Sequence, residues 1–184
     1  MKEPWIEHSN IWKSKSAFTS FLRGGIRRAL WNRSPIKLEF IKKNRKKIAN
    51  PNPKGKVKEV WGATCALCGN DFPLSEMNVD HITGNHSLND LSDIQTFVEN
   101  IVCVSFDDLQ FVDKACHKIK SHCEKQGISF EEARMEKIAI DLVKKGMCKD
   151  WLESKGVVPA SSQAKRRIQI VELLKEEKKD EQEE

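Results

Sequence analysis

The sequence predicts a mainly helical α+β protein. Three stretches carry apolar residues at three- and four-residue spacing, which is the pattern of helices that bury one face. A shorter segment, residues 77–82, alternates apolar and polar residues as a half-buried strand does. Charged residues make up 32% of the 184 residues and the mean hydropathy is −0.57, so we expect one compact domain with helical arms.

Residues 1–56 are predicted to form a basic helical arm. The first 15 residues show no clear period and are expected to be an irregular lead that packs its two tryptophans. An amphipathic helix is expected over residues 16–31. Gly24 and Gly25 each cost a helix about 1 kcal/mol relative to alanine, so a kink at this pair stays open.

A second helix of the arm is expected to start at Ser34, as its cap, and Pro35, as its first residue. This helix is expected to continue into the basic residues 42–47. Two prolines and a glycine within residues 50–55 then predict the boundary between the arm and the next domain.

Positive charge is concentrated in the arm. Residues 1–60 contain 16 Lys and Arg against 4 Asp and Glu, a net charge of +12, which leaves −7 for the rest of a chain whose total is +5. Such a segment suits a polyanion, because neutralised phosphates release counterions. A solvated basic helix, or an arm folded back on the acidic half, is the alternative. The candidate nucleic-acid contacts are Arg23, Arg27, Arg28, Lys42, Lys43, Arg45, Lys46 and Lys47.

Residues 57–126 are predicted to form the core domain. Its first motif is Cys65-Ala-Leu-Cys68-Gly69, which has the spacing of a metal knuckle, with the glycine permitting a tight turn after the second thiol. The strand over residues 77–82 follows. Short helices are expected over residues 91–102 and 113–124.

A second set of ligand types lies around this strand. Asp80-His81 falls near its end, and Cys116-His117 follows 35 residues later. Zinc prefers thiolate and imidazole, whereas magnesium and manganese prefer carboxylate, water and phosphate oxygen with an occasional imidazole. The core therefore offers two distinct metal environments, one to hold the fold and one to cut, a combination that indicates phosphodiester cleavage.

Residues 127–184 are predicted to form C-terminal helices that pack on the core and end in a frayed, charged tail. Ser129 and Glu132 form a capping box at the start of one amphipathic helix. Another is expected after Pro159.

The cellular compartment is predicted from the cysteines and from the N-terminus. The chain has six cysteines, shows no signal peptide, and has no apolar run approaching 18 residues. We expect an intracellular protein with reduced thiols and no membrane partner, in which Cys-x-x-Cys serves metal or redox chemistry.

The motifs together resemble those of the HNH endonucleases of the ββα-metal (His-Me finger) class, in particular small phage-borne members. The match runs from the cysteine knuckle through Val79-Asp80-His81-Ile82 to Leu109-Gln110 and Cys116-His117-Lys118-Ile119-Lys120-Ser121. It implies a ββα-metal nuclease core with N- and C-terminal helical extensions, acting on DNA in the host cytoplasm. It also implies a catalytic Mg²⁺ or Mn²⁺ ion, a structural Zn²⁺ ion, and product ends with a 5′-phosphate and a 3′-hydroxyl.

Two positions depart from the family pattern. Family members carry Cys-x-x-Cys-His before the last helix, and here Asp113 stands at the first of those cysteines. Asp108 stands where the family has the asparagine that gives HNH its middle letter. Asp108 is expected to orient the base by its side chain or its backbone, although an ordinary turn aspartate is the alternative.

The resemblance and the residue chemistry assign roles to three side chains. His81 is the candidate general base, since a neutral imidazole can take a proton from water near neutral pH. Asp80 and His117 are the candidate ligands of one catalytic divalent cation, whose open positions would take water and phosphate oxygens. The alternatives are a structural role for His81 and a place in the zinc site for His117.

The structural zinc site is predicted from the remaining ligands. Its expected members are Cys65, Cys68, Cys116 and, in place of a fourth thiolate, Asp113. Cys103 and Cys123 compete for the fourth position, and thiols that simply pack without metal are the alternative.

Six further residues have weaker assignments. Lys118 and Lys120 could bind the phosphate beside the scissile one, although solvated lysines are the default. His86 and His122 are expected on the surface. Trp61 is expected in the core rather than as a platform for base stacking, and Cys148 is expected to be buried.

The function predicted from the sequence is that of a metal-dependent HNH endonuclease that cleaves DNA, of a phage nicking or homing type. Two alternatives stay open. The first is an HNH nuclease that resolves branched DNA or works with a phage terminase. The second is a zinc-stabilised DNA-binding module without catalysis.

Overall fold

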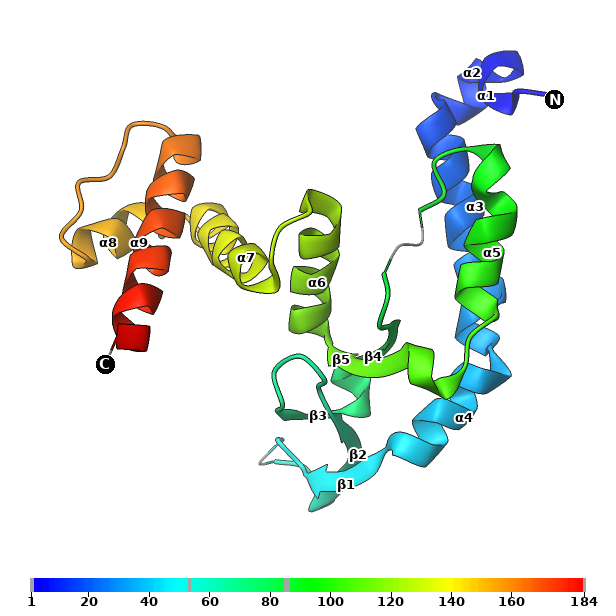
Figure 1. Ribbon diagram of the computed structural model, residues 1–184, viewed down its shortest axis with the longest axis horizontal. Helices are drawn as coiled ribbons and strands as arrows, with labels where there is room; N and C mark the ends of the chain where they lie inside the picture. The colour runs from blue at the N-terminus through cyan, green and yellow to red at the C-terminus, as the bar shows by residue number, and fades with distance from the viewer. Residues whose placement is uncertain (1, 53, 85–86, 184) are drawn as a thin grey trace. The chain divides into compact units, whose positions relative to one another are not determined.

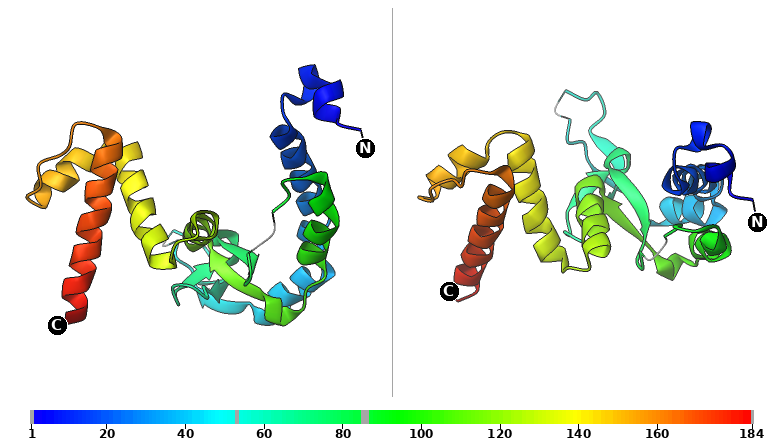
Figure 2. Two further views of the ribbon diagram at one scale, coloured as in Figure 1. Left: turned by 45° about the horizontal axis from the view of Figure 1, so that its top comes forward. Right: turned by 90° about the horizontal axis from the view of Figure 1, so that it is seen from above.

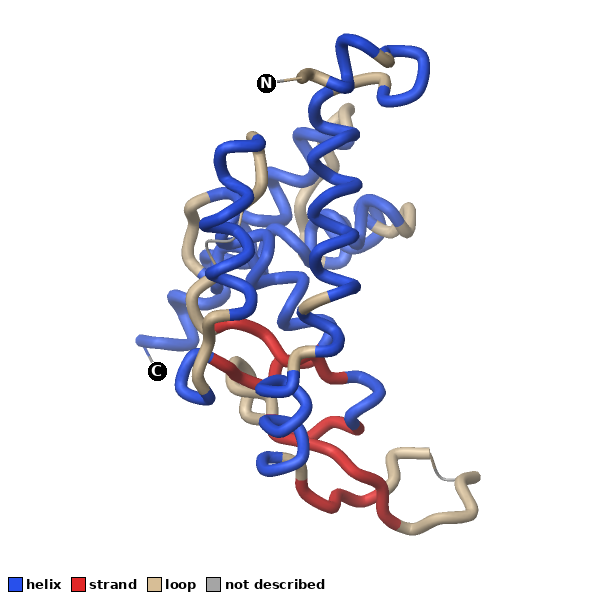
Figure 3. Tube along the Cα trace, turned by 90° about the vertical axis from the view of Figure 1, so that its right-hand side faces the viewer, coloured by secondary structure: helices blue, strands red, loops and turns tan. Residues whose placement is uncertain are grey.

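The computed structural model describes residues 2–52, 54–84 and 87–183, and the chain divides into two compact units, Met1–His117 and Lys118–Glu184. Most described residues lie in helices and the strands are short and antiparallel, which confirms the mainly helical α+β class (Figure 3). The division falls within a helix that begins at Lys114, so the predicted three-part division of the chain stays a prediction. His86 lies outside the described residues.

The first unit opens with the helices α1 (Pro4–Glu7), α2 (Ser9–Trp12) and α3 (Lys15–Ala29). The prediction of an irregular lead is wrong, because α1 and α2 are short helices. Their tryptophans pack on one ring of α3: the centroid of Phe18 lies 5.5 Å from that of Trp5 and 4.8 Å from that of Trp12.

Helix α3 runs without a break through Gly24 and Gly25, so the kink left open by the sequence does not occur. It lies beside α5 (Ile94–Val102), the helix expected over residues 91–102 (Figures 1 and 2). Leu88, Phe97 and Ile101 are buried there, with side chains of α3 packed against them. Packing of Leu22 and Ile26 against this group acts against the cost of the two glycines, which is about 1 kcal/mol each.

Ser34 caps α4 (Pro35–Asn44) by accepting a hydrogen bond from the amide of Lys37, as the sequence predicted. The helix ends at Asn44, so the prediction that residues 45–47 continue it is wrong. These residues lead instead into β1 (Lys46–Ala49), which pairs with β2 (Glu59–Thr64). Residues 50–52 and 54–55 of the predicted boundary lie in the loop of this hairpin, and Pro53 lies outside the described residues.

Two small sheets complete the first unit. In one, β2 lies between β1 and β3 (Asp71–Pro73). In the other, β4 (Met77–His81) pairs with β5 (Leu109–Asp113), and α6 (Lys114–Gln126) follows β5 directly. The first unit also has single-turn helices: η1 (Trp31–Arg33), η2 (Leu74–Glu76), η3 (Leu91–Asp93) and η4 (Phe106–Asp108).

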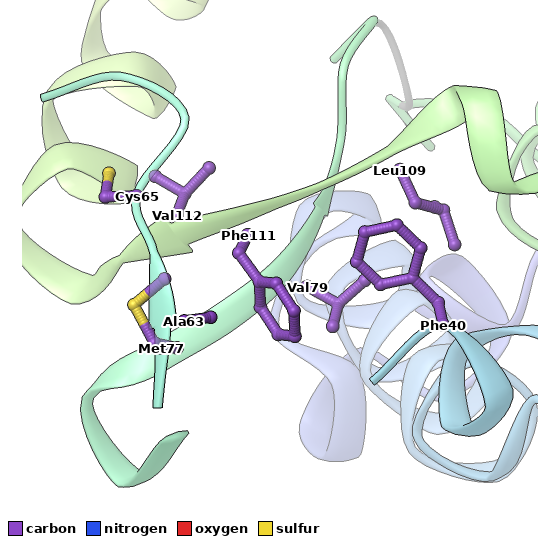
Figure 4. Close-up of a cluster of buried hydrophobic side chains, with 8 residues drawn as sticks. All are labelled: Phe40, Ala63, Cys65, Met77, Val79, Leu109, Phe111 and Val112. Carbon is purple, nitrogen blue, oxygen red and sulfur yellow. The ribbon is translucent and has the colours of Figure 1, made fainter. Parts of the chain in front are cut away.

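The core of the first unit joins α4 to both sheets. Met77 and Val79 of β4 and Phe111 of β5 are buried, as the alternation in β4 predicts. Figure 4 shows the ring of Phe40 from α4 next to this strand pair, and Cys65 at the other end of the group beside Val112. Cys65, the first cysteine of the knuckle, is therefore part of the apolar core.

The second unit contains the helices α7 (Phe130–Lys144), α8 (Cys148–Ser154) and α9 (Gln163–Glu183). The capping box of Ser129 and Glu132 is confirmed. The buried residues of its core come from all three helices: Ala139, Cys148, Leu152 and Ile170. The burial of Cys148 is thus confirmed, whereas α8 has no counterpart in the sequence predictions.

Among the residues that the structure describes, no helix is both long and apolar enough to pass through a bilayer. All six cysteines are free.

Candidate functional site

The junction between β5 and α6 brings together most of the predicted ligands. Asp113 ends β5, and Cys116 and His117 lie in the first turn of α6. The register of the hairpin sets Met77 opposite Asp113 and Asp80 opposite Gln110. Met77 rather than Asp80 is therefore level with the start of α6, and Asp80 approaches α6 through the side chain of His117.

The predicted soft ligands lie close together. The ligand atoms of Cys65, Cys68, Asp113 and Cys116 all lie within 4.8 Å of one another, and together they could hold a metal ion. We refer to these four residues as the thiol cluster. Its spacing fits zinc chemistry, since ligands about 2.3 Å from a tetrahedral ion are roughly 4 Å apart.

The knuckle that contributes two of these thiols is closed by backbone hydrogen bonds. The amide of Cys65 donates to the carbonyl of Asn70 at 2.8 Å, and the amide of Gly69 donates to the carbonyl of Cys65 at 2.9 Å. Gly69 has φ of +74°, a left-handed conformation that glycine adopts without strain. The amide of Ala66 donates to Phe111 of β5, which fixes the knuckle to the hairpin.

Asp113 uses its two carboxylate oxygens differently. Oδ1 accepts hydrogen bonds from the amides of Ala115 at 2.8 Å and Cys116 at 3.1 Å, so it caps α6. Oδ2 lies 3.8 Å from Sγ of Cys68, which donates to it. One carboxylate thus caps the helix and faces the thiols.

Burial shapes the titration of the cluster. Burial raises the pKa of the Cys65 thiol. It also raises the pKa of Cys116, helped by the carboxylate of Asp113. Burial alone would raise the pKa of Asp113, but hydrogen bonds from Cys116, Cys65 and Ala115 together outweigh it and lower that pKa.

The competing ligands are placed elsewhere. Cys103 is exposed after α5, and Sγ of Cys123 donates to the carbonyl of Ile128 at 2.8 Å. Neither belongs to the thiol cluster found among the described residues. His117 also stays out of it and faces Asp80 instead.

Asp80 and His117 form the second ligand group, which we call the acid–imidazole pair. Nε2 of His117 lies 3.4 Å from Oδ1 of Asp80, and the side-chain Nε2 of Gln110 donates to Oδ2 at 3.4 Å. The Asp80 side chain is 14% exposed and the His117 side chain 38% exposed. Within this pair, Asp80 is mostly buried and held by Gln110, whereas His117 is partly exposed to solvent.

His81 follows Asp80 but lies in a different environment. Its ring stacks on Trp31, with centroids 4.4 Å apart and planes at 33°. Its Nε2 lies 3.4 Å from the carbonyl oxygen of Ile101, which can only accept a hydrogen bond. A neutral imidazole that donates from Nε2 carries its lone pair on Nδ1.

Asp108 is engaged mainly with its own turn. Its carboxylate accepts hydrogen bonds from the amide of Ser105 at 2.7 Å and from its hydroxyl at 2.9 Å. These bonds lower the pKa of Asp108, with a smaller contribution from the charge of His81. Its carbonyl accepts the amide of Ile82 at 2.9 Å, directly after His81. Asp108 thus contributes backbone to the strand end that carries the histidine.

The basic residues of the arm are spread over α3, α4 and β1. Arg27 lies over the ring of Phe97 and Lys43 over that of Phe106, whereas Lys46 forms an ion pair with Asp71 at 2.7 Å. Arg23 and Arg28 lie on α3, with Arg28 exposed, and Lys42 is exposed on α4. They share a chain segment, not a single element.

The lysines of α6 differ from each other. Lys118 is exposed. Lys120 has only 12% of its side chain exposed and pairs with Glu124 at 2.6 Å. It is therefore not the solvated lysine that the default interpretation expected.

The sequence missed two contacts near these groups. The stacking of Trp31 on His81 gave no signal, because it joins distant segments. Gln110 was part of the family match, but its hydrogen bond to Asp80 was not predicted. The prediction that Trp61 lies in the core is wrong, since 42% of it is exposed. The prediction of a surface His122 is also wrong: its side chain is 11% exposed and Nε2 lies 2.7 Å from Glu136.

Comparison with models of protein families, with curated proteins and with solved structures finds no match for this chain.

Proposed function

We propose that this protein is a metal-dependent endonuclease of the HNH type that hydrolyses phosphodiester bonds in DNA. The observation that carries the proposal is the 3.4 Å approach of Asp80 and His117 at the junction of a β-hairpin and a helix. The motif spacing in the sequence predicts this approach. The β4–β5–α6 order is also the order of a ββα-metal core.

The acid–imidazole pair fits a hard divalent cation. Two ligands about 2.1 Å from one Mg²⁺ ion are roughly 3 to 4 Å apart, and the observed separation of 3.4 Å lies in that range. Two protein ligands leave the remaining positions to water and phosphate oxygens. A Mg²⁺ or Mn²⁺ ion bound there supplies positive charge to the phosphate and to the departing 3′-oxygen.

His81 is the proposed general base. Its contact with the carbonyl of Ile101 and its stacking on Trp31 hold the ring in place, and the imidazole would accept a proton from water. Asp108 acts as a positioning residue through the carbonyl that accepts the amide of Ile82. A neutral ring oriented in this way is the form that general-base catalysis requires.

The thiol cluster is the proposed structural zinc site. Three thiols and one carboxylate match the preference of zinc for sulfur, with oxygen tolerated as a fourth ligand. Cys65 lies in the apolar core, so metal binding there would stabilise the fold and leave the chemistry to the acid–imidazole pair.

Cleavage of supercoiled plasmid with Mg²⁺ or Mn²⁺ tests the proposal. The wild type should cut, leaving 5′-phosphate ends that a ligase can join. His81→Ala should reduce the rate by at least about 100-fold while DNA binding persists, because a positioned base contributes that much or more. His8→Ala removes an exposed histidine and serves as the matched control.

A second candidate is a DNA-binding module stabilised by zinc but without catalysis. It is favoured by the engagement of Asp108 with Ser105, at the position where the family has its asparagine. If the wild type binds DNA but does not cut it with any divalent ion, this second function replaces the first. Branched against linear substrates, and cutting with and without a phage terminase, separate the enzyme roles.

A further inference from the structure

An exposed indole with two cations on its ring lies outside both ligand groups. The ring of Trp61 in β2 has the guanidinium carbon of Arg45 4.1 Å from its centroid and Nζ of Lys47 4.3 Å from it. An aromatic ring of this size that is 42% exposed is available to a partner.

The strand register explains how these three side chains meet. Lys47 is the cross-strand partner of Trp61, so the two side chains leave the same face of the β1–β2 pair. Arg45 precedes Lys47 by two residues and shares that face by the period of a strand. The next residue, Lys46, points to the other face, where Asp71 neutralises it at 2.7 Å.

The position of the indole is fixed by close packing of its strand. A Cβ atom on Gly62 would stand 2.4 Å from Cδ1 of Ile48 and 2.6 Å from the carbonyl oxygen of Phe72. Glycine therefore allows β1 and β3 to close on β2 from both sides. Trp61, the preceding residue, therefore lies on a strand with close neighbours on both sides.

We propose that Trp61, Arg45 and Lys47 form a binding site for single-stranded DNA, in which an unpaired base stacks on the indole and the two cations bind the adjoining phosphates. The inference rests on the proposed function for its choice of DNA, and it deepens that function by naming the form of DNA.

The energetics favour exchange of a cation for a base on the ring. A cation–π contact at an exposed site is weaker than the stacking of a nucleobase on an aromatic side chain. A base can therefore displace a cation from the ring. The displaced side chain then lies next to the phosphate of the same nucleotide, where it neutralises charge and releases counterions.

Stacking also selects against duplex. A paired base has both faces covered by its neighbours, whereas an unpaired base offers one face to the indole. Arg45 and Lys47 alone would bind the phosphates of either form. The preference for single strands is thus assigned to Trp61.

The test uses the full chain labelled with 5-fluorotryptophan, without added Mg²⁺ or Mn²⁺. The chain has five tryptophans, and Trp61→Phe identifies the fluorine signal of Trp61. A short oligothymidylate should shift that signal, and a blunt duplex should not. The signal of Trp151, in the second unit, is the internal reference.

Affinities of the variants complete the test. Trp61→Ala should weaken oligothymidylate binding about tenfold and leave duplex binding unchanged, while Trp61→Phe keeps most of the affinity and guards against misfolding. The double variant Arg45→Ala with Lys47→Ala should weaken the binding of both oligothymidylate and duplex. Lys54→Ala with Lys56→Ala removes the same charge from the exposed hairpin loop and should preserve the preference for single strands.

The outcomes are distinct. Equal losses on single strands and duplex in Trp61→Ala, or an unmoved Trp61 signal while single strands bind, overturns the stacking site but leaves the nuclease proposal intact. Tighter binding of oligouridylate through Trp61 overturns the assignment to DNA. Absence of binding to any nucleic acid overturns the site and the proposed function together.

Discussion

The first unit packs its apolar core against three thiols and a carboxylate, whereas the second unit packs an all-helical apolar cluster and ties its helices with ion pairs. In the second unit, Glu136 of α7 lies 2.7 Å from His122 of α6 and 2.9 Å from Arg167 of α9. The buried Arg166 donates to the carbonyls of Ala160 and Ser161.

The comparison predicts which change in conditions should destabilise each unit. The strands of the first unit have three to six residues, so its sheets are too small to be stable alone, and a bound ion at the thiol cluster would supply part of its stability. The second unit has no member of either ligand group among its described residues. Metal should therefore affect the first unit and protonation of carboxylates the second.

The largest effect is expected from Cys65→Ser. At a free Zn²⁺ concentration 100 times Kd, one site stabilises the folded state by about 2.7 kcal/mol, and the variant should lose at least this amount. Unfolding monitored by the fluorine signals of Trp31 and Trp61 should shift with Zn²⁺ in the wild type only. The Trp151 signal should not follow.

Cys103→Ser is the matched control for this change, because it removes an exposed thiol outside the thiol cluster. Equal zinc dependence of Cys65→Ser and the wild type would contradict a metal site in the first unit.

His117→Ala should abolish cleavage without unfolding the first unit, which separates the two ligand groups. We expect a rate at least about 100-fold lower, since a catalytic ion supplies several kcal/mol of charge stabilisation. Zinc content, measured by elemental analysis, should stay at the wild-type value. Loss of bound zinc in this variant would mean that His117 belongs to the thiol cluster.

A matched pair of glycines compares the units directly. Gly69 and Gly156 both have φ of +74° and no atom near an added Cβ. Alanine at either position should cost about 1–2 kcal/mol, because the left-handed conformation is unfavourable with a side chain. Only Gly69→Ala should also weaken zinc binding, as measured by competition with a chromophoric chelator.

The smallest effect is expected from Glu136→Gln. Hydrogen bonding to His122, more than the charge of Arg167, lowers the pKa of Glu136 below its ordinary 4.5. Its stabilising contribution is therefore complete above that pH and is lost as the pH falls through the lower, folded value. The variant should be up to about 1 kcal/mol less stable at neutral pH, since the group is partly exposed.

The pH dependence of this difference is the check. Unfolding followed at Trp151 should show the two proteins converging well below pH 4.5. Glu172→Gln, which changes an exposed glutamate of α9, should show no difference at any pH. A constant difference for Glu136→Gln at all pH values would exclude the carboxylate charge as its cause.

The sequence predicted those elements whose signals are local. Ser34 with Pro35, and Ser129 with Glu132, mark helix starts through hydrogen bonds within one turn. The thiol cluster was predicted because its members have metal-ligand spacing, and the hydrogen bond from the amide of Ala66 to Phe111 of β5 brings the knuckle to Asp113 and Cys116.

Features that depend on distant partners were missed. Strand β1 has the sequence Lys-Lys-Ile-Ala, which lacks a strand pattern, and its pairing depends on Gly62 of β2. The exposure of Trp61 depends on which elements cover β2, and no local pattern gives that. Trp31 could not be linked to His81 from sequence, since 50 positions separate them.

The two oxygens of Asp113 connect the thiols to the start of α6 through one side chain. An ion bound by Oδ2 would hold the carboxylate in place, and with it the first turn of the helix, in which His117 is the fourth residue. Loss of the ion would then be felt at the imidazole as a loss of orientation. A change at Asp113 would therefore also change the orientation of His117.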